Sequence, residues 1–222
     1  MRGPMTTQTR PVQIRAGAAL IDGDLTIPHR ASGLVVFAHG SGSGRFSRRN
    51  RAVAQTLEDG GLATLLMDLL TREEEAIDLQ TREYRFDIDR LSRRVVAAID
   101  WAASEAAISD LPIACFGAST GAAAALIAAA DRPSVVRAVI SRGGRPDLAG
   151  DVLPRVQAPT LLIVGGADDV VIELNRAAMQ RMRAHVQLEI IPGATHLFEE
   201  PGTLEQVSRL AAVWCHRYLV RT

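Results

Sequence analysis

The sequence predicts the α/β fold class, with a mostly parallel central sheet, helices on both faces and an antiparallel hairpin at the N-terminus. Short apolar runs alternate along the chain with segments whose apolar residues recur at helical spacing. Strands that are apolar throughout are typical of parallel sheets covered on both faces. The 222 residues are enough to bury a large core, and we expect one domain over residues 12–222 after a flexible tail of residues 1–11.

The hairpin comes first, in residues 12–16 and 20–28, around a Gly-Asp turn at residues 23–24. Continuous apolar runs then predict strands at residues 33–39, 62–70, 111–119, 135–141, 159–166 and 186–192. Helical spacing predicts helices at residues 49–61, 86–104, 120–132, 171–184 and 203–220. The charged segment 71–85 is expected to be an exposed loop, and the alternative is that residues 71–86 form a lid over the site.

The balance of charges argues against partners that would be attracted by a net electrostatic field of the whole protein. Lys plus Arg and Asp plus Glu number 25 each, so the formal net charge is zero. Nucleic acid and anionic membranes are therefore not favoured, and a small-molecule partner is expected; a homodimer is compatible with the sequence. Residues 1–10 lack the apolar segment of an export signal, so we expect a cytoplasmic protein.

The apolar stretch 122–130 is too short to span a bilayer and is expected to be a buried helix. The two cysteines, Cys115 and Cys215, lie far apart without metal-ligand spacing. We therefore expect buried free thiols and no metal site.

The pentapeptide Gly117-Ala-Ser-Thr-Gly121 has the G-x-S-x-G pattern, between an apolar strand and an alanine-rich helix. A nucleophile at a sharp strand-to-helix turn needs small neighbours so that the turn can close. The helix N-terminus beside it offers N–H groups to a developing oxyanion. Although a short pattern also arises by chance in ordinary tight turns, this context predicts that Ser119 is a nucleophile.

A serine hydroxyl needs a positioned base, which on such a sheet comes from a late loop. Among five histidines only His196 lies in the loop after the last strand, whereas His39 directly ends an early strand and is expected to shape its loop. The histidine in turn needs a carboxylate that orients it, which we expect in the loop after an earlier strand. The order Ser, Asp, His along the chain favours Asp168 for this role. Asp169, which we expect at the surface or capping a helix, and Asp147, after another strand, are the alternatives.

The oxyanion requires two backbone donors, one after the nucleophile and one in the loop after the third strand. Thr120 and Ser41 occupy those places. The glycine-rich loop at residues 39–44 would also suit a phosphate. It lacks the Lys-Ser/Thr ending of a P-loop and the spacing of a dinucleotide fingerprint, so phosphate binding is the secondary interpretation.

Two arginine groups bear on substrate choice. One surrounds the start of the first helix, and the other follows the strand at residues 135–141. Most arginines are merely solvated, but the second group lies at the carboxyl edge of the sheet, where ligand contacts gather. We hypothesise that one of its members binds a substrate carboxylate. The groups are Arg45, Arg48, Arg49 and Arg51, and Arg142 and Arg145.

From about Val12 to the last helix, the chain resembles the dienelactone hydrolase family of α/β hydrolases, especially small bacterial members, some of which are fused to a phosphoribosyltransferase domain. The segments that show it include HGSGSGRFSRRNRAVA, FGASTGAAAAL, SRGGRPDLAG, LLIVGGADDVVIELNR and PGATHLFEEPG. The resemblance implies the α/β-hydrolase fold and places Asp168 where the family's acid lies. Dienelactone hydrolase proper uses a cysteine nucleophile, whereas this chain has Ser119, which favours ordinary carboxylic ester hydrolysis.

The sequence therefore predicts a serine hydrolase that cleaves a small-molecule ester or lactone through a triad of Ser119, His196 and Asp168, without a metal or organic cofactor. The same scaffold would support thioester hydrolysis, acyl transfer or amide cleavage. A third hypothesis is a catalytically silent binding module that associates with a phosphoribosyltransferase.

Overall fold

The computed structural model describes residues 7–220. Eight strands form its sheet: β1 (Gln8–Ala16), β2 (Ala19–Ile27), β3 (Leu34–Ala38), β4 (Ala63–Met67), β5 (Ile113–Ala118), β6 (Val136–Arg142), β7 (Thr160–Gly165) and β8 (Val186–Ile191). The helices are α1 (Arg48–Asp59), α2 (Arg72–Thr81), α3 (Ile88–Ser104), α4 (Thr120–Asp131), α5 (Asp169–Arg181) and α6 (Thr203–Leu219), with a 3₁₀ segment η1 (Pro146–Arg155).

The strand order is β1-β2-β4-β3-β5-β6-β7-β8. β2 pairs antiparallel with both β1 and β4, and the pairs from β4 through β8 are parallel. The predicted fold class is confirmed. Because the parallel strands share one direction, the loops after β3, β5, β6, β7 and β8 meet at a single edge of the sheet.

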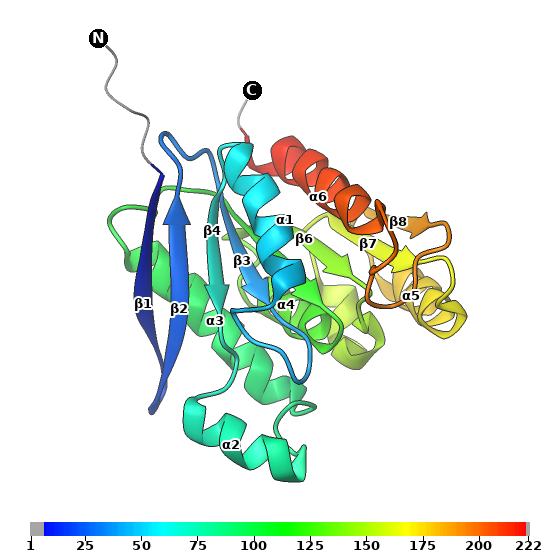
Figure 1. Ribbon diagram of the computed structural model, residues 1–222, viewed down its shortest axis with the longest axis horizontal. Coiled ribbons are helices and arrows are strands. Elements are labelled where there is room, and N and C mark those ends of the chain that lie inside the picture. The colour runs from blue at the N-terminus through cyan, green and yellow to red at the C-terminus, as the bar shows by residue number, and fades with distance from the viewer. Residues whose placement is uncertain (1–6, 221–222) are drawn as a thin grey trace.

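Helices cover both faces of the sheet (Figure 1). On one face, Leu57 of α1 and Trp214 of α6 pack with Phe37 of β3 in one apolar cluster. On the other face, α3, α4 and η1 pack in a second cluster, which includes Val95 and Leu126. The alternation of side chains along each strand divides the core between these two layers.

Helix α4 is the most deeply buried helix of the second layer. Ten of its residues are buried, and most of them are alanines. Such small side chains bring the helix backbone close to the strands beneath it. The start of α4 is therefore held firmly at the carboxyl edge of the sheet. None of the helices within residues 7–220 has both the length and the apolar character needed to cross a membrane.

The N-terminal hairpin is longer than expected, and its turn lies elsewhere. β1 begins at Gln8, so residues 8–11 belong to a strand and not to the expected tail, of which residues 1–6 lie outside the described part. These residues are exposed and their side chains are mostly polar, so the strand leaves no apolar pattern in the sequence. The turn is at Gly17, where φ is +65°, and Gly23 lies inside β2 opposite Val12.

The segment 71–85, expected to be an exposed loop, contains helix α2, so that interpretation was wrong. Thr71 and Glu74 form a capping box, in which each side chain accepts a hydrogen bond from the other residue's N–H group. α2 lies outside the two helical layers, beyond the ends of β3 and β4 (Figure 1). The helix was not predicted because the segment is mostly charged and has little apolar periodicity.

Candidate active site

Ser119 lies at a sharp turn between β5, which ends at Ala118, and α4, which begins at Thr120. Its φ is +50° and its ψ is −122°, a strained conformation for a residue with a side chain. The neighbouring loop holds it there, because the Ser119 N–H donates to the Arg142 carbonyl (3.3 Å) and the Ser119 carbonyl accepts from the Arg145 N–H (3.0 Å). The strain is thus imposed by the surrounding backbone.

Glycines make this turn possible. A side chain at Gly121 would overlap the carbonyl oxygens of Ala38 and His39, and one at Gly117 would overlap the backbone of α4. A Cβ atom at Gly40 would lie 3.0 Å from the Ser119 Cβ atom. The glycine-rich loop after β3 therefore approaches the serine more closely than a chain with side chains would allow.

His196 and Asp168 lie in the loops after β8 and β7. The Nδ1 atom of His196 lies 2.7 Å from the Oδ2 atom of Asp168. Asp168 is the N-cap residue of α5, yet its side chain makes no capping hydrogen bond, so its carboxylate faces the histidine instead. The Nδ1 atom donates to that carboxylate, which leaves Nε2 as the free basic nitrogen of the ring.

The two alternative carboxylates lie in other surroundings. Asp169 is exposed in the first turn of α5, where a negative charge complements the helix dipole. Asp147 accepts two hydrogen bonds from the Arg145 guanidinium, at 2.9 and 2.7 Å. Of the three candidates, Asp168 is the one bonded to His196.

His39 has the loop-shaping contacts that its position predicts. The Leu69 N–H donates to its Nε2 atom (3.0 Å), so the proton of the neutral ring is on Nδ1, which donates to the Gly40 carbonyl (2.8 Å). Burial lowers the pKa of His39 below its ordinary value of 6.5, and its backbone partner and the carboxylates of Asp68 and Glu75 only partly oppose this. His39 therefore ties the loop after β3 to the loop after β4.

The two residues proposed as oxyanion donors flank Ser119. Thr120 is the first residue of α4, and the first N–H groups of a helix have no partner within it. Ser41 follows Gly40, the glycine that abuts Ser119, and its own side chain is exposed. On the opposite side, a Cβ atom at Gly143 would lie 3.0 Å from the His196 carbonyl oxygen, so the loop after β6 touches the histidine loop.

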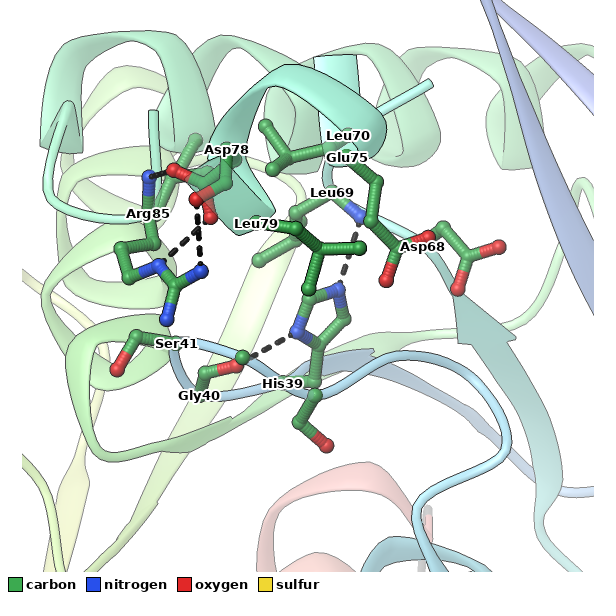
Figure 2. Close-up of a pocket in the computed structure, with 13 residues that line it drawn as sticks. His39, Gly40, Ser41, Asp68, Leu69, Leu70, Glu75, Asp78, Leu79 and Arg85 are labelled. Carbon is green, nitrogen blue, oxygen red and sulfur yellow. Dashed lines mark hydrogen bonds and ion pairs between the residues drawn. The ribbon is translucent and has the colours of Figure 1, made fainter. Parts of the chain in front are cut away.

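A cavity lies beside the Ser41 turn, between this turn and α2 (Figure 2). The enclosed space is about 50 Å³, enough for only a few water molecules. Apolar side chains from the loop after β4, from α2 and from α3 form much of its lining, which includes Leu69, Leu70, Leu79 and Leu91. The segment 71–86, considered above as a lid, thus forms one wall of a pocket beside the Ser41 turn, and Gly40, which abuts Ser119, belongs to the lining of that pocket.

Asp78 and Arg85 hold this wall together. Buried Asp78 accepts from the N–H groups of Tyr84 and Arg85 (2.9 Å each) and from the Arg85 Nε atom (2.6 Å). Burial raises the pKa of Asp78, but these hydrogen bonds outweigh it and keep that pKa below its ordinary value. The Arg85 Nη2 atom donates to the Asp78 carbonyl (2.9 Å). The Nη1 atom points toward the turn at Ser41 (Figure 2) and would lie 3.5 Å from a Cβ atom at Gly42.

Of the two arginines predicted after β6, the side chain of Arg145 is bonded to Asp147. Arg142 is buried and donates to the Oδ1 atom of Asn50 (3.2 Å) in the first turn of α1. Our sequence reasoning missed Asn50, Asp78 and Arg85. The capping box at Thr71 would have revealed α2, but no sequence signal pairs Asn50 with a residue 92 positions away.

The two cysteines are buried free thiols, as expected. Burial raises the pKa of Cys115 and of Cys215 to about 12. Thiols are poor nucleophiles unless they are ionised. Cys115, although only four positions before Ser119, is therefore suited to packing and not to nucleophilic attack.

Comparison with known proteins identifies a family and several relatives of the chain. Residues 21–215 match the model of the dienelactone hydrolase family. A protein of Mycobacterium tuberculosis strain H37Rv, whose name provisionally calls it a phosphoribosyl transferase, is 57% identical over 203 residues. That match covers 91% of this chain but 45% of the relative, so the chain spans about half the length of the curated relatives it matches.

Among solved structures, the dienelactone hydrolase from Anabaena variabilis is 54% identical, with a TM-score of 0.94 over 96% of this chain and 99% of that one. Est1E from Butyrivibrio proteoclasticus, at 18% identity and a TM-score of 0.78 over 93% of this chain and 98% of that one, shares the fold. The family model matches most of the chain, and a solved dienelactone hydrolase is 54% identical to it. The chain therefore belongs to the dienelactone hydrolase family of α/β hydrolases.

Proposed function

We propose that the protein is a serine hydrolase that cleaves small carboxylic esters through an acyl-enzyme intermediate. The observation on which this rests is the 2.7 Å contact between the His196 Nδ1 atom and the Asp168 carboxylate, at the sheet edge where Ser119 is held in a strained turn. A base oriented by a carboxylate, together with a half-buried serine at the same edge of the sheet, is the arrangement that acyl transfer requires.

In this mechanism the Ser119 Oγ atom attacks the ester carbonyl carbon and gives its proton to the His196 Nε2 atom. Asp168 holds the ring in the tautomer that keeps Nε2 basic and stabilises the imidazolium that forms. The N–H groups of Ser41 and Thr120 donate to the oxyanion. The departing alcohol takes the proton back, and a water activated by the same nitrogen releases the acid.

The cavity beside Ser41 supports a small acyl group. Its volume of about 50 Å³ admits a short chain, and its leucines would exclude water from the reacting carbonyl. A long acyl chain would have to displace α2 from the positions held by Asp78. We therefore propose short-chain esters or lactones as the substrate class.

The name of the Mycobacterium tuberculosis relatives suggests a second candidate. Because those proteins are about twice as long as the matched region, this hydrolase unit would act beside, or bind, a phosphoribosyl transferase. A silent binding module would not require a carboxylate aligned on a histidine beside a strained serine. Catalysis is therefore the better supported proposal.

Fluorophosphonate labelling located by peptide mass, combined with hydrolysis of a para-nitrophenyl ester series, tests the proposal. We expect labelling on Ser119, turnover that declines as the acyl chain lengthens, and loss of both in Ser119→Ala. Absence of labelling and hydrolysis in folded protein would favour the binding module. Retained hydrolysis in Ser119→Ala would show that another residue attacks the ester.

A further inference from the structure

The turn that carries Ser41 is rich in glycine. Residues 40–44 include three glycines, and a chain of this composition loses much conformational freedom when it is fixed in one conformation. The Ser43 N–H group donates to the Gly40 carbonyl at 3.2 Å, and Gly42 has a φ of +68°. A hydrogen bond of this kind closes the turn but does not fix the direction of the Ser41 N–H group. Contacts from outside the turn are therefore needed to hold it.

The loop after β4 supplies such contacts at both ends of the turn. At the start, the Leu69 N–H group donates to the His39 ring, which donates to the Gly40 carbonyl (Figure 2). At the far end, the Asp68 Oδ1 atom accepts from the Arg45 N–H group at 2.8 Å, and the Oδ2 atom forms an ion pair with the Arg45 guanidinium. Because Asp68 and Leu69 are consecutive, one short segment holds both ends.

Asp68 is itself well anchored. Its N–H group donates to the Asp22 carbonyl in β2 at 3.0 Å, and a Cβ atom at Gly44 would lie 2.9 Å from its Oδ1 atom. The side chains of Asp68 and Arg45 are 23% and 15% exposed, so salt screens this pair less than a surface pair. The Asp22 and Asp24 carboxylates lie 3.9 and 3.8 Å from the guanidinium, too far for a hydrogen bond.

We propose that Asp68 is a positioning residue for the reaction, which acts through Arg45 to hold the Ser41 N–H group in the direction that the oxyanion requires. Donors that are oriented before the reaction stabilise the developing charge without a cost of reorganisation. Because this stabilisation is realised in the transition state, its loss lowers kcat more than it changes KM. The proposal rests on the esterase function proposed above and adds a residue to its machinery.

The test measures kcat and KM for a short para-nitrophenyl ester in Asp68→Ala and Asp68→Asn. In Asp68→Ala, kcat should fall by about 10- to 100-fold, since one of the two oxyanion donors is no longer oriented, and KM should stay within about twofold. Asp68→Asn keeps an oxygen for the Arg45 N–H group and loses the charge, so its kcat should be intermediate. It also carries the test if Asp68→Ala fails to fold.

Asp24→Ala is the matched control. Asp24 also faces the Arg45 guanidinium, at 3.8 Å, and its removal takes away an equal charge without a contact to the backbone of the turn. Its kcat should stay within about twofold of the wild-type value. An equal loss in Asp24→Ala and Asp68→Ala would indicate only a general loss of negative charge around Arg45 and would overturn the proposal.

An inhibitor that forms a tetrahedral adduct separates positioning from a loss of folded protein. The oxyanion of a short alkyl trifluoromethyl ketone adduct resembles that of the reaction, so the inhibition constant should rise in Asp68→Ala by about the factor by which kcat/KM falls. Fluorophosphonate titration, carried to completion, counts the intact sites. Unchanged kcat per intact site, or a lower kcat with an unchanged inhibition constant, would overturn the proposal.

Amide hydrogen exchange over residues 40–45 tests the same contact without catalysis. Exchange should be faster in Asp68→Ala and unchanged in Asp24→Ala. If the wild type neither reacts with fluorophosphonate nor hydrolyses esters, but exchange rises in Asp68→Ala alone, Asp68 does hold the turn and the esterase proposal is the one that fails. If the wild type hydrolyses esters while kcat and exchange are unchanged in Asp68→Ala, the esterase function stands and the positioning role is wrong.

Discussion

The Asp168 carboxylate accepts from the His196 Nδ1 atom at 2.7 Å, although Asp168 begins a helix whose N–H groups it would ordinarily cap. A capping hydrogen bond stabilises a protein by about 1 kcal/mol. The side chain is directed to the histidine instead. Stability given up at a particular residue is typical of functional sites.

We first predict that Asp168→Asn lowers kcat for ester hydrolysis by roughly 10³- to 10⁴-fold, because the amide no longer holds the tautomer that keeps Nε2 basic. Steady-state kinetics with a short para-nitrophenyl ester measure the effect. Asp169→Asn is the matched control, since Asp169 is exposed one position later, and its kcat should stay within about twofold. An equal loss in both variants would contradict the assignment of the acid.

The second prediction concerns stability and pH at His39. Burial lowers its pKa, so at mildly acidic pH the unfolded chain binds more protons than the folded protein, and stability rises with pH. The contribution of His39 is complete above its unfolded value of 6.5 and declines as the pH falls toward the lowered folded value. His39→Gln should cost about 1–3 kcal/mol near neutral pH.

Urea unfolding of both proteins from about pH 8 to about pH 5 measures this difference. The gap in unfolding free energy between wild type and His39→Gln should narrow toward the acidic end. If the gap is constant across this range, His39 is not held neutral by its surroundings.

The third prediction is that Gly121→Ala destabilises the protein, although alanine is the better helix former. Helix propensity alone would favour the substitution by about 1 kcal/mol. The new methyl group would instead overlap the carbonyl oxygens of Ala38 and His39, and forced overpacking costs about 1–3 kcal/mol or more. Thermal unfolding decides the sign: a raised Tm would mean that the turn has room which the structure does not show.

The fourth prediction is that Leu79→Ala shifts the ester preference toward longer acyl chains. Leu79 lines the cavity beside Ser41 yet is 70% exposed, so its loss should change stability by less than about 0.5 kcal/mol. The ratio of kcat/KM for para-nitrophenyl octanoate to that for the acetate should rise. Val213→Ala, at a similarly exposed position on α6, should leave the ratio unchanged.

The order of the elements could be predicted from the sequence because each is encoded locally. The apolar runs of β3, β5 and β7 and the helical spacing of α1 and α6 each reflect burial on the sheet. The contact of Asp168 with His196 could also be anticipated, since the loops after parallel strands meet at one edge. Chain order alone fits both Asp168 and Asp169; the family resemblance and the expected capping or surface position of Asp169 favoured Asp168.

What the sequence did not disclose depends on long-range contacts or on backbone pairing. Residues 8–11 join a strand through hydrogen bonds that leave no side-chain pattern. α2 is fixed by its cap at Thr71 and by the bonds of Asp78, not by an apolar face. The contact of Arg142 with Asn50 depends on which distant elements lie together, and that is known only once the chain has folded.

The alanine-filled packing of α4 determines where this protein can change through evolution. Ser119 stands at the start of a helix with ten buried residues, and almost any larger side chain there would displace it. α2 has one buried residue, Asp78, and apart from Glu74 of the capping box its other positions are exposed. Under the proposed function, substitutions in α2 would therefore alter the choice of substrate while Ser119 and its helix keep the reaction chemistry unchanged.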